Sequence, residues 1–199
     1  MVVGLDLAGS PNRTTGFCAL GNDLIARLAP LRSDEEILAH TLGARPSVVS
    51  VDAPLSLPRG RKTIEDRSGP HLRECDRELL RRHIRFFPVT LGPMRMLTTR
   101  GLALKRQFES EGLTVIESYP GAAQDILGIP RKKAGIERLR RGLVRWGLEG
   151  DVRHRGRTHD ELDAATSAIV GRMFLEGDAE ALGDPTEGLM YVPRARAIV

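Results

Sequence analysis

The first fifty residues place three strand patterns, a helix pattern and a fourth strand pattern in one order. The apolar run at 2–7 predicts a buried strand, and the segments 14–20 and 24–31 predict two more, joined by hairpin-type turns. A helix is expected over 33–43, because it opens with a Ser-x-x-Glu capping box. The β-branched segment 47–52 then predicts another buried strand. A meander followed by a helix and a further strand indicates an α/β fold with a central mixed sheet.

The rest of the chain continues the same alternation of strands and helices. Helical patterns are expected at 71–85, 94–111, 121–127, 133–147 and 159–176, and strands at 113–118 and 188–193. The segment 56–70 has the composition of a loop and carries several basic residues. With no internal repeat and no linker, we expect a single domain over 1–199, with a helical insertion at about 56–112.

Composition excludes several classes of protein. No stretch of about 18 apolar residues is present, so no membrane partner is expected. Asp6 interrupts the apolar run that a signal peptide would need at the amino terminus. Cys18 and Cys75 have no motif spacing, which argues against a disulfide framework or a cysteine-based zinc site. We therefore expect a cytoplasmic protein.

The positive charge of the chain is built from arginine. Net charge is +4, and only four of the 30 basic residues are lysine, which leaves 26 arginines. Arginine binds phosphate in a bidentate manner, so a nucleic-acid partner is one explanation. Use of arginine for ordinary surface charge, as in a GC-rich genome, is the other.

Two acids close strands that are expected to lie side by side. Asp6 ends the first strand and Asp52 ends the fourth. If these strands are parallel neighbours, both carboxylates emerge at the same edge of the sheet, where open α/β sheets bind ligands. An acid in this place can also simply form a turn or cap the next helix.

The last helix carries a second pair of acids. A Thr158–Glu161 capping box defines its start, and Asp160 and Asp163 lie three residues apart on one face. Acids in a first turn are also favoured by the helix dipole, so a structural role stays open. The helix is expected to approach the sheet closely because small residues follow, namely Ala164, Ala165 and Ala168.

Acids that arrive from two strands and a late helix suggest metal chemistry. Clustered carboxylate oxygens are the donors that Mg²⁺ and Mn²⁺ prefer. Two such ions about 3.5–4 Å apart can stabilise both sides of a phosphoryl displacement. We therefore expect Asp6, Asp52 and Asp163 to hold Mg²⁺ or Mn²⁺, with Asp160 joining or tuning them.

The order of elements resembles the ribonuclease H-like fold. The segment 4–9 resembles the opening of the RuvC-type Holliday junction resolvases, and 160–165 resembles the carboxylate pair on their last helix. The chain is also similar, over nearly its whole length, to an uncharacterised family of predicted nucleases with this fold. Four segments carry that likeness: Val51-Asp-Ala-Pro-Leu55, Arg73-Glu-Cys-Asp76, Glu117-Ser-Tyr-Pro120 and His159-Asp-Glu-Leu-Asp163-Ala.

The resemblance implies a metal-dependent nuclease that hydrolyses nucleic-acid phosphodiesters by a two-metal mechanism. One position departs from the resolvases, which carry Glu where this chain has Asp52, a shorter side chain. Glu117, at the end of the strand 113–118, would then supply the missing carboxylate and complete a metal set with Asp6, Asp52 and Asp163. The expected partner is DNA or RNA, and the oligomeric state stays open.

Arginine-rich loops are candidates for phosphate contacts. They carry Arg59, Arg61, Lys62 and Arg67 in one case and Arg153, Arg155 and Arg157 in the other. Aromatic residues make up only 4% of the chain, which favours structured or double-stranded substrates over single strands read by stacking.

Two other functions remain open on the sequence. One is an ATP-binding protein of the actin and sugar-kinase superfold, which shares this strand order and has a similar first phosphate hairpin. Such proteins close two of these domains on the nucleotide, however, and this chain is long enough for one. The other is a non-catalytic nucleic-acid-binding module that retains the acids.

Overall fold

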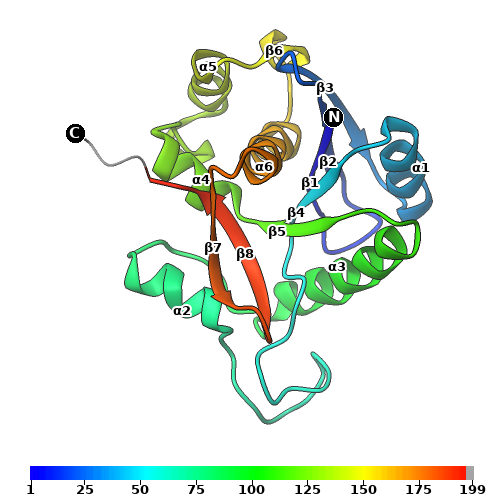
Figure 1. The fold of residues 1–199 in the computed structure, drawn as a ribbon, viewed down its shortest axis with the longest axis vertical. Coiled ribbons are helices and arrows are strands. Elements are labelled where there is room, and N and C mark those ends of the chain that lie inside the picture. The colour runs from blue at the N-terminus through cyan, green and yellow to red at the C-terminus, as the bar shows by residue number, and fades with distance from the viewer. Residues whose placement is uncertain (196–199) are drawn as a thin grey trace.

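A mixed eight-stranded sheet runs through the molecule in the order β6-β3-β2-β1-β4-β5-β8-β7 (Figure 1). The structure is a computed structural model and describes residues 1–195. Its strands are β1 (Val2–Asp6), β2 (Thr15–Leu20), β3 (Ile25–Leu31), β4 (Val48–Asp52), β5 (Val115–Ser118), β6 (Glu149–Gly150), β7 (Ala179–Asp184) and β8 (Gly188–Pro193). Strands β1 to β3 form the antiparallel meander, and β4, β5 and β8 run parallel to β1. The predicted α/β fold with a mixed sheet is confirmed.

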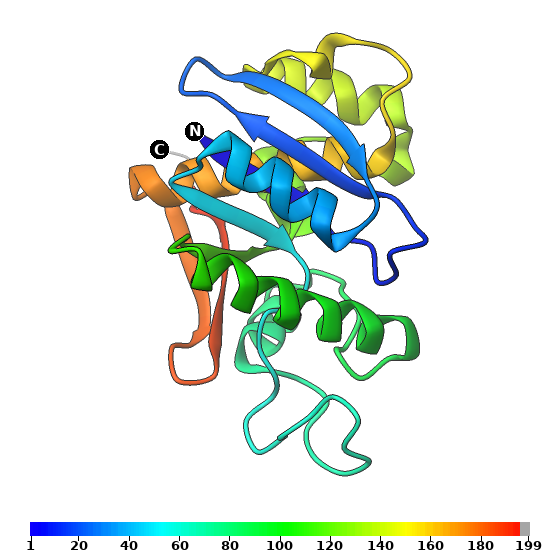
Figure 2. The ribbon, with the colours of Figure 1, turned by 90° about the vertical axis from the view of Figure 1, so that its right-hand side faces the viewer.

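Helices cover both faces of this sheet. They are α1 (Asp34–Ala44), α2 (Glu74–Arg81), α3 (Gly92–Ser110), α4 (Pro120–Leu127), α5 (Ile136–Trp146) and α6 (His159–Glu176), with short 3-10 turns η1 (Lys132–Ala134) and η2 (Asp151–Arg153). Figure 2 shows α1 and α3 side by side in front of the strands. Helices α4, α5 and α6 lie on the opposite face, and α2 lies against the β7–β8 hairpin (Figure 1). The sheet is therefore the middle of three layers.

Strand pleating divides the core between the two faces. Val2, Val48 and Ile116 belong to the apolar cluster under α6. Val3, Val49 and Val51 belong to the cluster under α1 and α3. Successive side chains along a strand alternate between faces, so this division sets which face each strand-end acid occupies.

Helix α6 lies unusually close to the sheet. Every residue from Glu161 to Gly171 is buried, as expected for a helix enclosed on all sides. A Cβ atom added at Gly4 would overlap the backbone of Ala164 and Ala168, and one at Gly16 would overlap the backbone of Asp160. Two glycines on the strands and small residues on the helix thus bring the backbones into direct contact.

Two strands and the length of one helix were not predicted. Strand β7 buries only Leu182, so its pattern carries no alternation that the sequence could have shown. Strand β6 has only two residues. The helix expected at 71–85 is limited to α2, and the chain turns at His83 with a positive φ of 57°. Within residues 1–195, no helix combines the length and apolar character needed to cross a membrane.

Candidate active site

Asp6 and Asp52 are adjacent at the carboxyl end of the sheet. Strands β1 and β4 pair in parallel, and Asp6 lies directly opposite Asp52 in their register. Both residues are partly buried and share the face covered by α6, because Val2 and Val48 on the same strands pack under that helix. The strand ends therefore bring together the two acids that the sequence singled out.

Asp163 adds a third carboxylate from α6. Its side chain is only 4% exposed, and its two oxygens have different partners. Oδ1 accepts a hydrogen bond of 2.7 Å from Gln124 Nε2 of α4, and Oδ2 accepts one of 3.0 Å from Lys132 Nζ of η1. The Thr158–Glu161 capping box, predicted from the sequence, sets the start of α6 and so the place of Asp163. We call Asp6, Asp52 and Asp163 the acid cluster.

Burial and mutual repulsion disfavour the charged form of the carboxyl groups in the acid cluster. Burial and then the nearby charges of Asp52 and Asp163 raise the pKa of Asp6 well above its usual value. Burial, then the charge of Asp163 and to a smaller extent that of Glu117, raise the pKa of Asp52 to about 8, although Lys132 acts in the other direction. Perturbed acids of this kind are concentrated at functional sites.

Asp160 lies at the margin of the acid cluster. It is in the first turn of α6, partly buried, and its charge adds to the rise in the pKa of Asp6. Within residues 1–195 no cation pairs with its side chain at salt-bridge distance. Its position fits tuning of the cluster better than direct participation.

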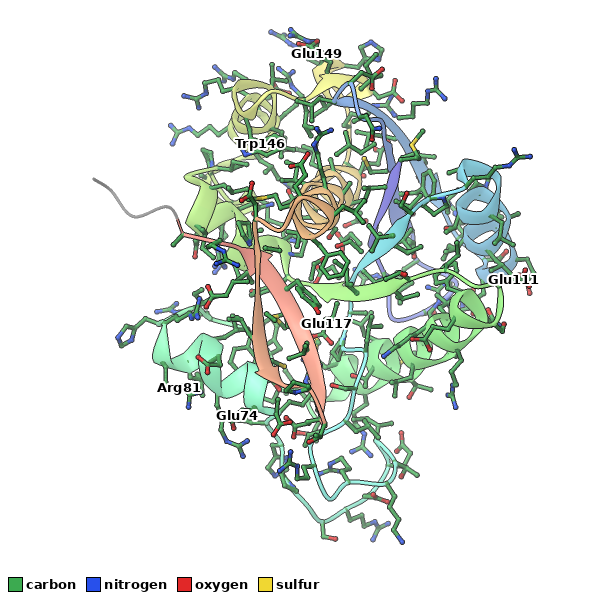
Figure 3. All side chains as sticks on the ribbon, viewed as in Figure 1. Glu74, Arg81, Glu111, Glu117, Trp146 and Glu149 are labelled. Carbon is green, nitrogen blue, oxygen red and sulfur yellow. The ribbon has the colours of Figure 1, made fainter. Side chains whose placement is uncertain are left out.

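Glu117 lies outside the acid cluster, although its charge also contributes to the raised pKa of Asp52. It follows Ile116, which packs under α6, so its own side chain lies on the other face of the sheet. Both of its oxygens are occupied: Arg73 donates to them at 2.6 and 2.8 Å, and the Leu55 amide donates at 2.7 Å. Figure 3 labels Glu117 beside β5, near the centre of the view. These contacts do not support Glu117 as a metal ligand, because no oxygen is left uncompensated.

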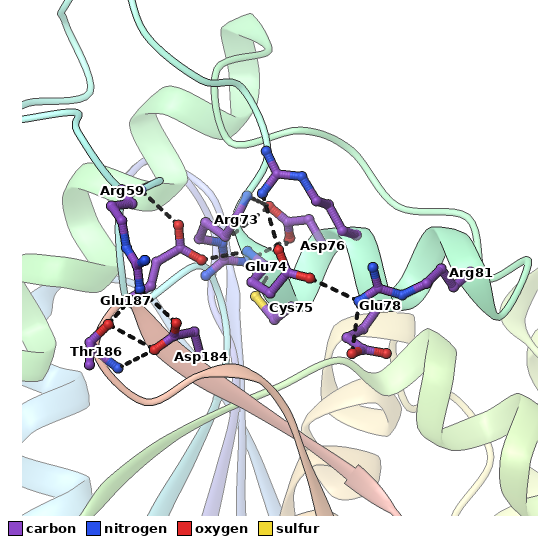
Figure 4. Close-up of polar contacts among 11 residues, drawn as sticks. Arg59, Arg73, Glu74, Cys75, Asp76, Glu78, Arg81, Asp184, Thr186 and Glu187 are labelled. Atoms are coloured by element: carbon purple, nitrogen blue, oxygen red, sulfur yellow. Dashed lines mark hydrogen bonds and ion pairs between the residues drawn. The ribbon is translucent and has the colours of Figure 1, made fainter.

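Arg73 is the centre of a buried network on that side. It is 2% exposed, and besides Glu117 it binds Asp76, which is also 2% exposed, at 3.0 Å. Figure 4 shows Arg73 and Asp76 at the start of α2, with Glu187 beside them. Glu187, in the turn between β7 and β8, accepts hydrogen bonds from the backbone amides of Arg59 and Glu74. We call Arg73, Asp76 and Glu117 the paired network.

The arginine-rich loops are mainly engaged in holding the structure. Arg61 is 7% exposed and donates to the backbone oxygens of its own loop, at Asp66, Gly69 and Pro70. Arg59 pairs with Asp184, and Arg153 pairs with Glu149. Arg157 pairs with Asp151 and Glu161. Protein partners thus occupy some or all of the donors of these four arginines, and phosphate binding by the two loops stays a prediction.

A large cavity opens beside the acid cluster. It has a volume of about 680 Å³ and reaches from Asp52 and Asp163 toward the chain between α2 and α3. Glu117 and Arg73 also line it. The acid cluster is therefore accessible to a ligand of moderate size.

The donor set of the acid cluster suits a hard divalent cation. Three carboxylates supply oxygen only, and the ammonium group of Lys132 already lies on Asp163 where a cation would balance them. Lys132 is half-exposed, so it can leave without breaking the core. Within residues 1–195, however, no three acidic, histidine or cysteine side chains are as close together as ligands around an ion. The carboxylates of the acid cluster are suitable ligands for a divalent cation, but in this structure the ammonium group of Lys132 balances their charge.

Sequence reasoning missed two residues of the site and one long-range ion pair. Lys132 and Gln124 contact Asp163, but each is distant from it in sequence and lies in no motif. Arg73 and Asp76 both belong to the segment Arg73-Glu-Cys-Asp76 singled out in the sequence, and they form an ion pair. The bond from Arg73 to Glu117 spans 44 residues and has no local signal.

Comparisons with known proteins agree with this architecture. Among curated proteins none matches the chain. A solved structure of RuvC from T. thermophilus in complex with Holliday junction substrate matches with a TM-score of 0.51 and 16% identity, over 88% of this chain and 96% of that chain. At this identity the match establishes the ribonuclease H-like fold, as expected from the order of elements. A family model described as "Protein of unknown function (DUF429)" matches residues 4–188, and the chain therefore belongs to that family.

Proposed function

We propose that this protein is a metal-dependent nuclease that hydrolyses phosphodiester bonds of nucleic acid. The observation that carries the proposal is the convergence of Asp6, Asp52 and Asp163 at one end of the sheet. The shared fold with RuvC, which was solved with a Holliday junction, supports nucleic acid as the substrate class. A resident cation of the Mg²⁺ or Mn²⁺ type belongs to this proposal.

The acid cluster would hold the cation. Asp6 and Asp52 offer side-by-side carboxylates from paired strands, and Asp163 faces them from α6. When bound, such ions polarise the phosphate and lower the pKa of bound water. No protein nucleophile is required, and the thiols suit one poorly, because both Cys18 and Cys75 are buried and burial raises the pKa of each.

The surrounding residues position and protect the acids. Gln124 orients Asp163 through one oxygen, and Lys132 balances the other. Asp160 contributes negative charge at the edge of the cluster. The paired network joins the end of β5 to the start of α2, and its three residues also line the cavity.

The direct test is cleavage of a panel of labelled duplexes, junctions, hybrids and single strands with Mg²⁺ or Mn²⁺ at low salt. We expect cleavage by the wild-type protein and a loss of at least about 100-fold in Asp6→Asn combined with Asp163→Asn, since both changes remove cation ligands. Asp178→Asn, at an exposed position after α6, is the matched control and should retain activity. Cleavage that survives the double substitution would show that the activity lies elsewhere or is a contaminant.

A binding module is the second candidate, and Lys132 is the observation in its favour. An ammonium that balances the acids can make a cation unnecessary. In that case the protein would bind nucleic acid without metal and cleave none of the panel. Binding of Mn²⁺ by the wild-type protein, lost in Asp163→Asn, would contradict this alternative.

A further inference from the structure

The cavity beside the acid cluster collects a large share of the aromatic residues. The chain has eight aromatic residues in 199, and three of them line this cavity: Phe86, Phe87 and Tyr119. Leu97 and Met94 add further apolar wall. Its volume of about 680 Å³ falls within the range of about 300–1,000 Å³ usual for small-molecule sites. Although the chain as a whole is poor in aromatic residues, three of the eight are gathered at this cavity.

Of these aromatic residues, Phe87 offers the open ring. It lies between α2 and α3 and is 68% exposed, the highest fraction among the large exposed apolar side chains of residues 1–195. Tyr119 is held instead, because its hydroxyl donates to the Arg85 carbonyl at 2.6 Å and the Arg131 guanidinium lies 5.9 Å from its ring centre. An exposed phenyl ring at the mouth of an apolar cavity is available for stacking by a flat ligand.

Ser118 adds an unused polar group to the same cavity. Its side chain is 1% exposed, and its hydroxyl has no hydrogen-bond partner. It follows Glu117 on β5, so it shares the α6 face with Asp52 on the neighbouring strand. A buried hydroxyl without a partner is destabilising unless something else binds it, so a polar group of a ligand is the natural partner.

Two cations at the rim are also unoccupied. Arg85 and Lys133 line the cavity and are exposed, and neither has a carboxylate partner within the part of the chain that the structure describes. Arg131, by contrast, pairs with Asp125. Two free cations that line the same cavity as Asp52 and Asp163 are suited to bind a phosphate group there.

We propose that this cavity binds a nucleotide whose base is unpaired. The base would stack on Phe87 with a polar edge on Ser118, and its phosphate would lie between the Arg85–Lys133 rim and the acid cluster. Its catalytic relevance rests on the proposed nuclease function, which it deepens by naming a substrate with an unstacked nucleotide. The low aromatic content of the chain argued against recognition by base stacking, and this proposal differs from that expectation. An unpaired nucleotide in a strand and a free mononucleotide share this chemistry, and the test distinguishes them.

The test is binding in EDTA, measured by fluorescence anisotropy, so that no cleavage is needed. The probes are a labelled duplex with a single unpaired adenosine and the same duplex fully paired. We expect the bulged duplex to bind about tenfold more tightly, and Phe87→Ala to remove that preference, since base stacking on an aromatic ring is worth this much. Leu175→Ala is the matched control, because Leu175 is an exposed apolar residue of α6 that does not line the cavity.

A second pair of variants separates ligand binding from folding. Ser118→Ala should weaken binding of the bulged duplex severalfold without lowering the melting temperature, because the hydroxyl makes no bond within the protein. Ser167→Ala is matched to it: Ser167 is also a buried, unpartnered hydroxyl, but it lies on α6 outside the cavity lining. It should change neither quantity.

The source of the nucleotide is decided by competition with adenosine monophosphate. Displacement of the bulged duplex by this mononucleotide supports the proposal and assigns a free nucleotide as ligand; failure to displace, with the bulge still preferred, assigns an unpaired nucleotide in a strand. Equal binding of both duplexes, unchanged in Phe87→Ala and insensitive to the mononucleotide, would overturn the inference. Binding with a preference for the bulge but no cleavage under any condition would refute the nuclease and leave the cavity assignment standing. Cleavage of paired duplexes without any preference for the bulge would support the nuclease and refute the cavity assignment.

Discussion

The paired network lines the same cavity as Asp52 and Asp163 of the acid cluster, but the two groups treat buried carboxylates in opposite ways. In the paired network, Glu117 and Asp76 both bind the same buried guanidinium, and this charge pairing raises the pKa of Arg73 well above its usual value against the effect of burial. In the acid cluster, Asp6 and Asp52 adjoin other acids, and one half-exposed lysine offsets them.

The paired network therefore has a structural role, and the acid cluster has the features of a functional site. Buried ions that satisfy one another contribute to a defined structure, while buried ions of like charge lower stability and persist where they serve a ligand. Both groups were visible in the sequence as acids at the ends of elements. The two groups differ only in the partners of each acid. Variants that change those partners therefore test the difference, and the variants below follow in decreasing order of predicted effect.

The largest effect is expected for Arg73→Met. Its loss leaves Glu117 and Asp76 buried without a cation, which typically costs about 3–5 kcal/mol. Urea unfolding of the variant measures this change. Arg81→Met is the control, since Arg81 is exposed and pairs with Glu74 and Glu78, and such pairs are worth about 0–1 kcal/mol. Equal losses in both variants would contradict the role assigned to the network.

The second-largest effect is expected from metal binding, which should depend on the acid cluster and not on the paired network. At a Mn²⁺ concentration of 100 times Kd, the free energy of unfolding should rise by about 2.7 kcal/mol. For a chain of this size, that corresponds to an increase in melting temperature of roughly 5–10 °C. Asp163→Asn should abolish the rise, because it removes a proposed ligand.

The matched variant in this experiment is Asp76→Asn, in the paired network. It starts from a lower melting temperature, but its increase with Mn²⁺ should equal that of the wild-type protein. The same increase in Asp163→Asn, or none in the wild-type protein, would count against cation binding at the acid cluster.

A smaller effect is expected for Asp52→Asn, and it should depend on pH. The pKa of Asp52 is about 8 in the folded protein and near 3.8 when unfolded, so the folded state binds the proton more tightly. Stability of the wild-type protein therefore declines as pH rises through the interval from about 4 to 8. Asn carries no charge, so Asp52→Asn should gain at least about 1.4 kcal/mol relative to wild type between pH 4 and 8. Denaturant unfolding in EDTA at pH 4 and at pH 8 measures the free energy of unfolding of both proteins. If the difference between them is the same at both pH values, Asp52 does not carry a buried charge.

The smallest effect concerns Lys132. Its ammonium group on Asp163 must be displaced by an incoming cation, and half-exposed ion pairs are worth less than about 1 kcal/mol. Lys132→Gln should therefore tighten Mn²⁺ binding by up to about fivefold, measured by calorimetry. Lys133→Gln, the neighbouring lysine without an ion pair in residues 1–195, should leave the affinity unchanged. Weaker Mn²⁺ binding in Lys132→Gln would show that the lysine assists the cation instead of competing with it.

The order of strands and the positions of Asp6, Asp52 and Asp163 could be predicted because they rest on local patterns. Short apolar runs mark the strands, an acid marks where each ends, and the capping box marks the start of α6. Parallel pairing then brings strand ends together. These inferences need no contact between distant segments beyond the sheet itself.

The placement of Glu117 could not be predicted in the same way. Strand β5 has four residues, and Val115 and Ile116 are both apolar, so its sequence does not show which residues face α6. A shift of one position exchanges the faces, and with them the partners of Glu117 and Ser118. The cavity aromatics are equally hidden, because Phe86 and Phe87 meet Tyr119 only through the folded chain. Strand β7, with a single buried residue, offered too little pattern.

The contact of α6 with Gly4 and Gly16 has a consequence for how this protein can change. Backbone atoms meet there, so the distance between helix and sheet is already at its lower limit and does not depend on the size of core side chains. Substitutions elsewhere in the core can alter stability while Asp163 keeps its distance from the ends of β1 and β4. A side chain at either glycine must push the helix outward and carry Asp163 with it. The spacing of the acids is thus controlled by two residues that have no side chain at all.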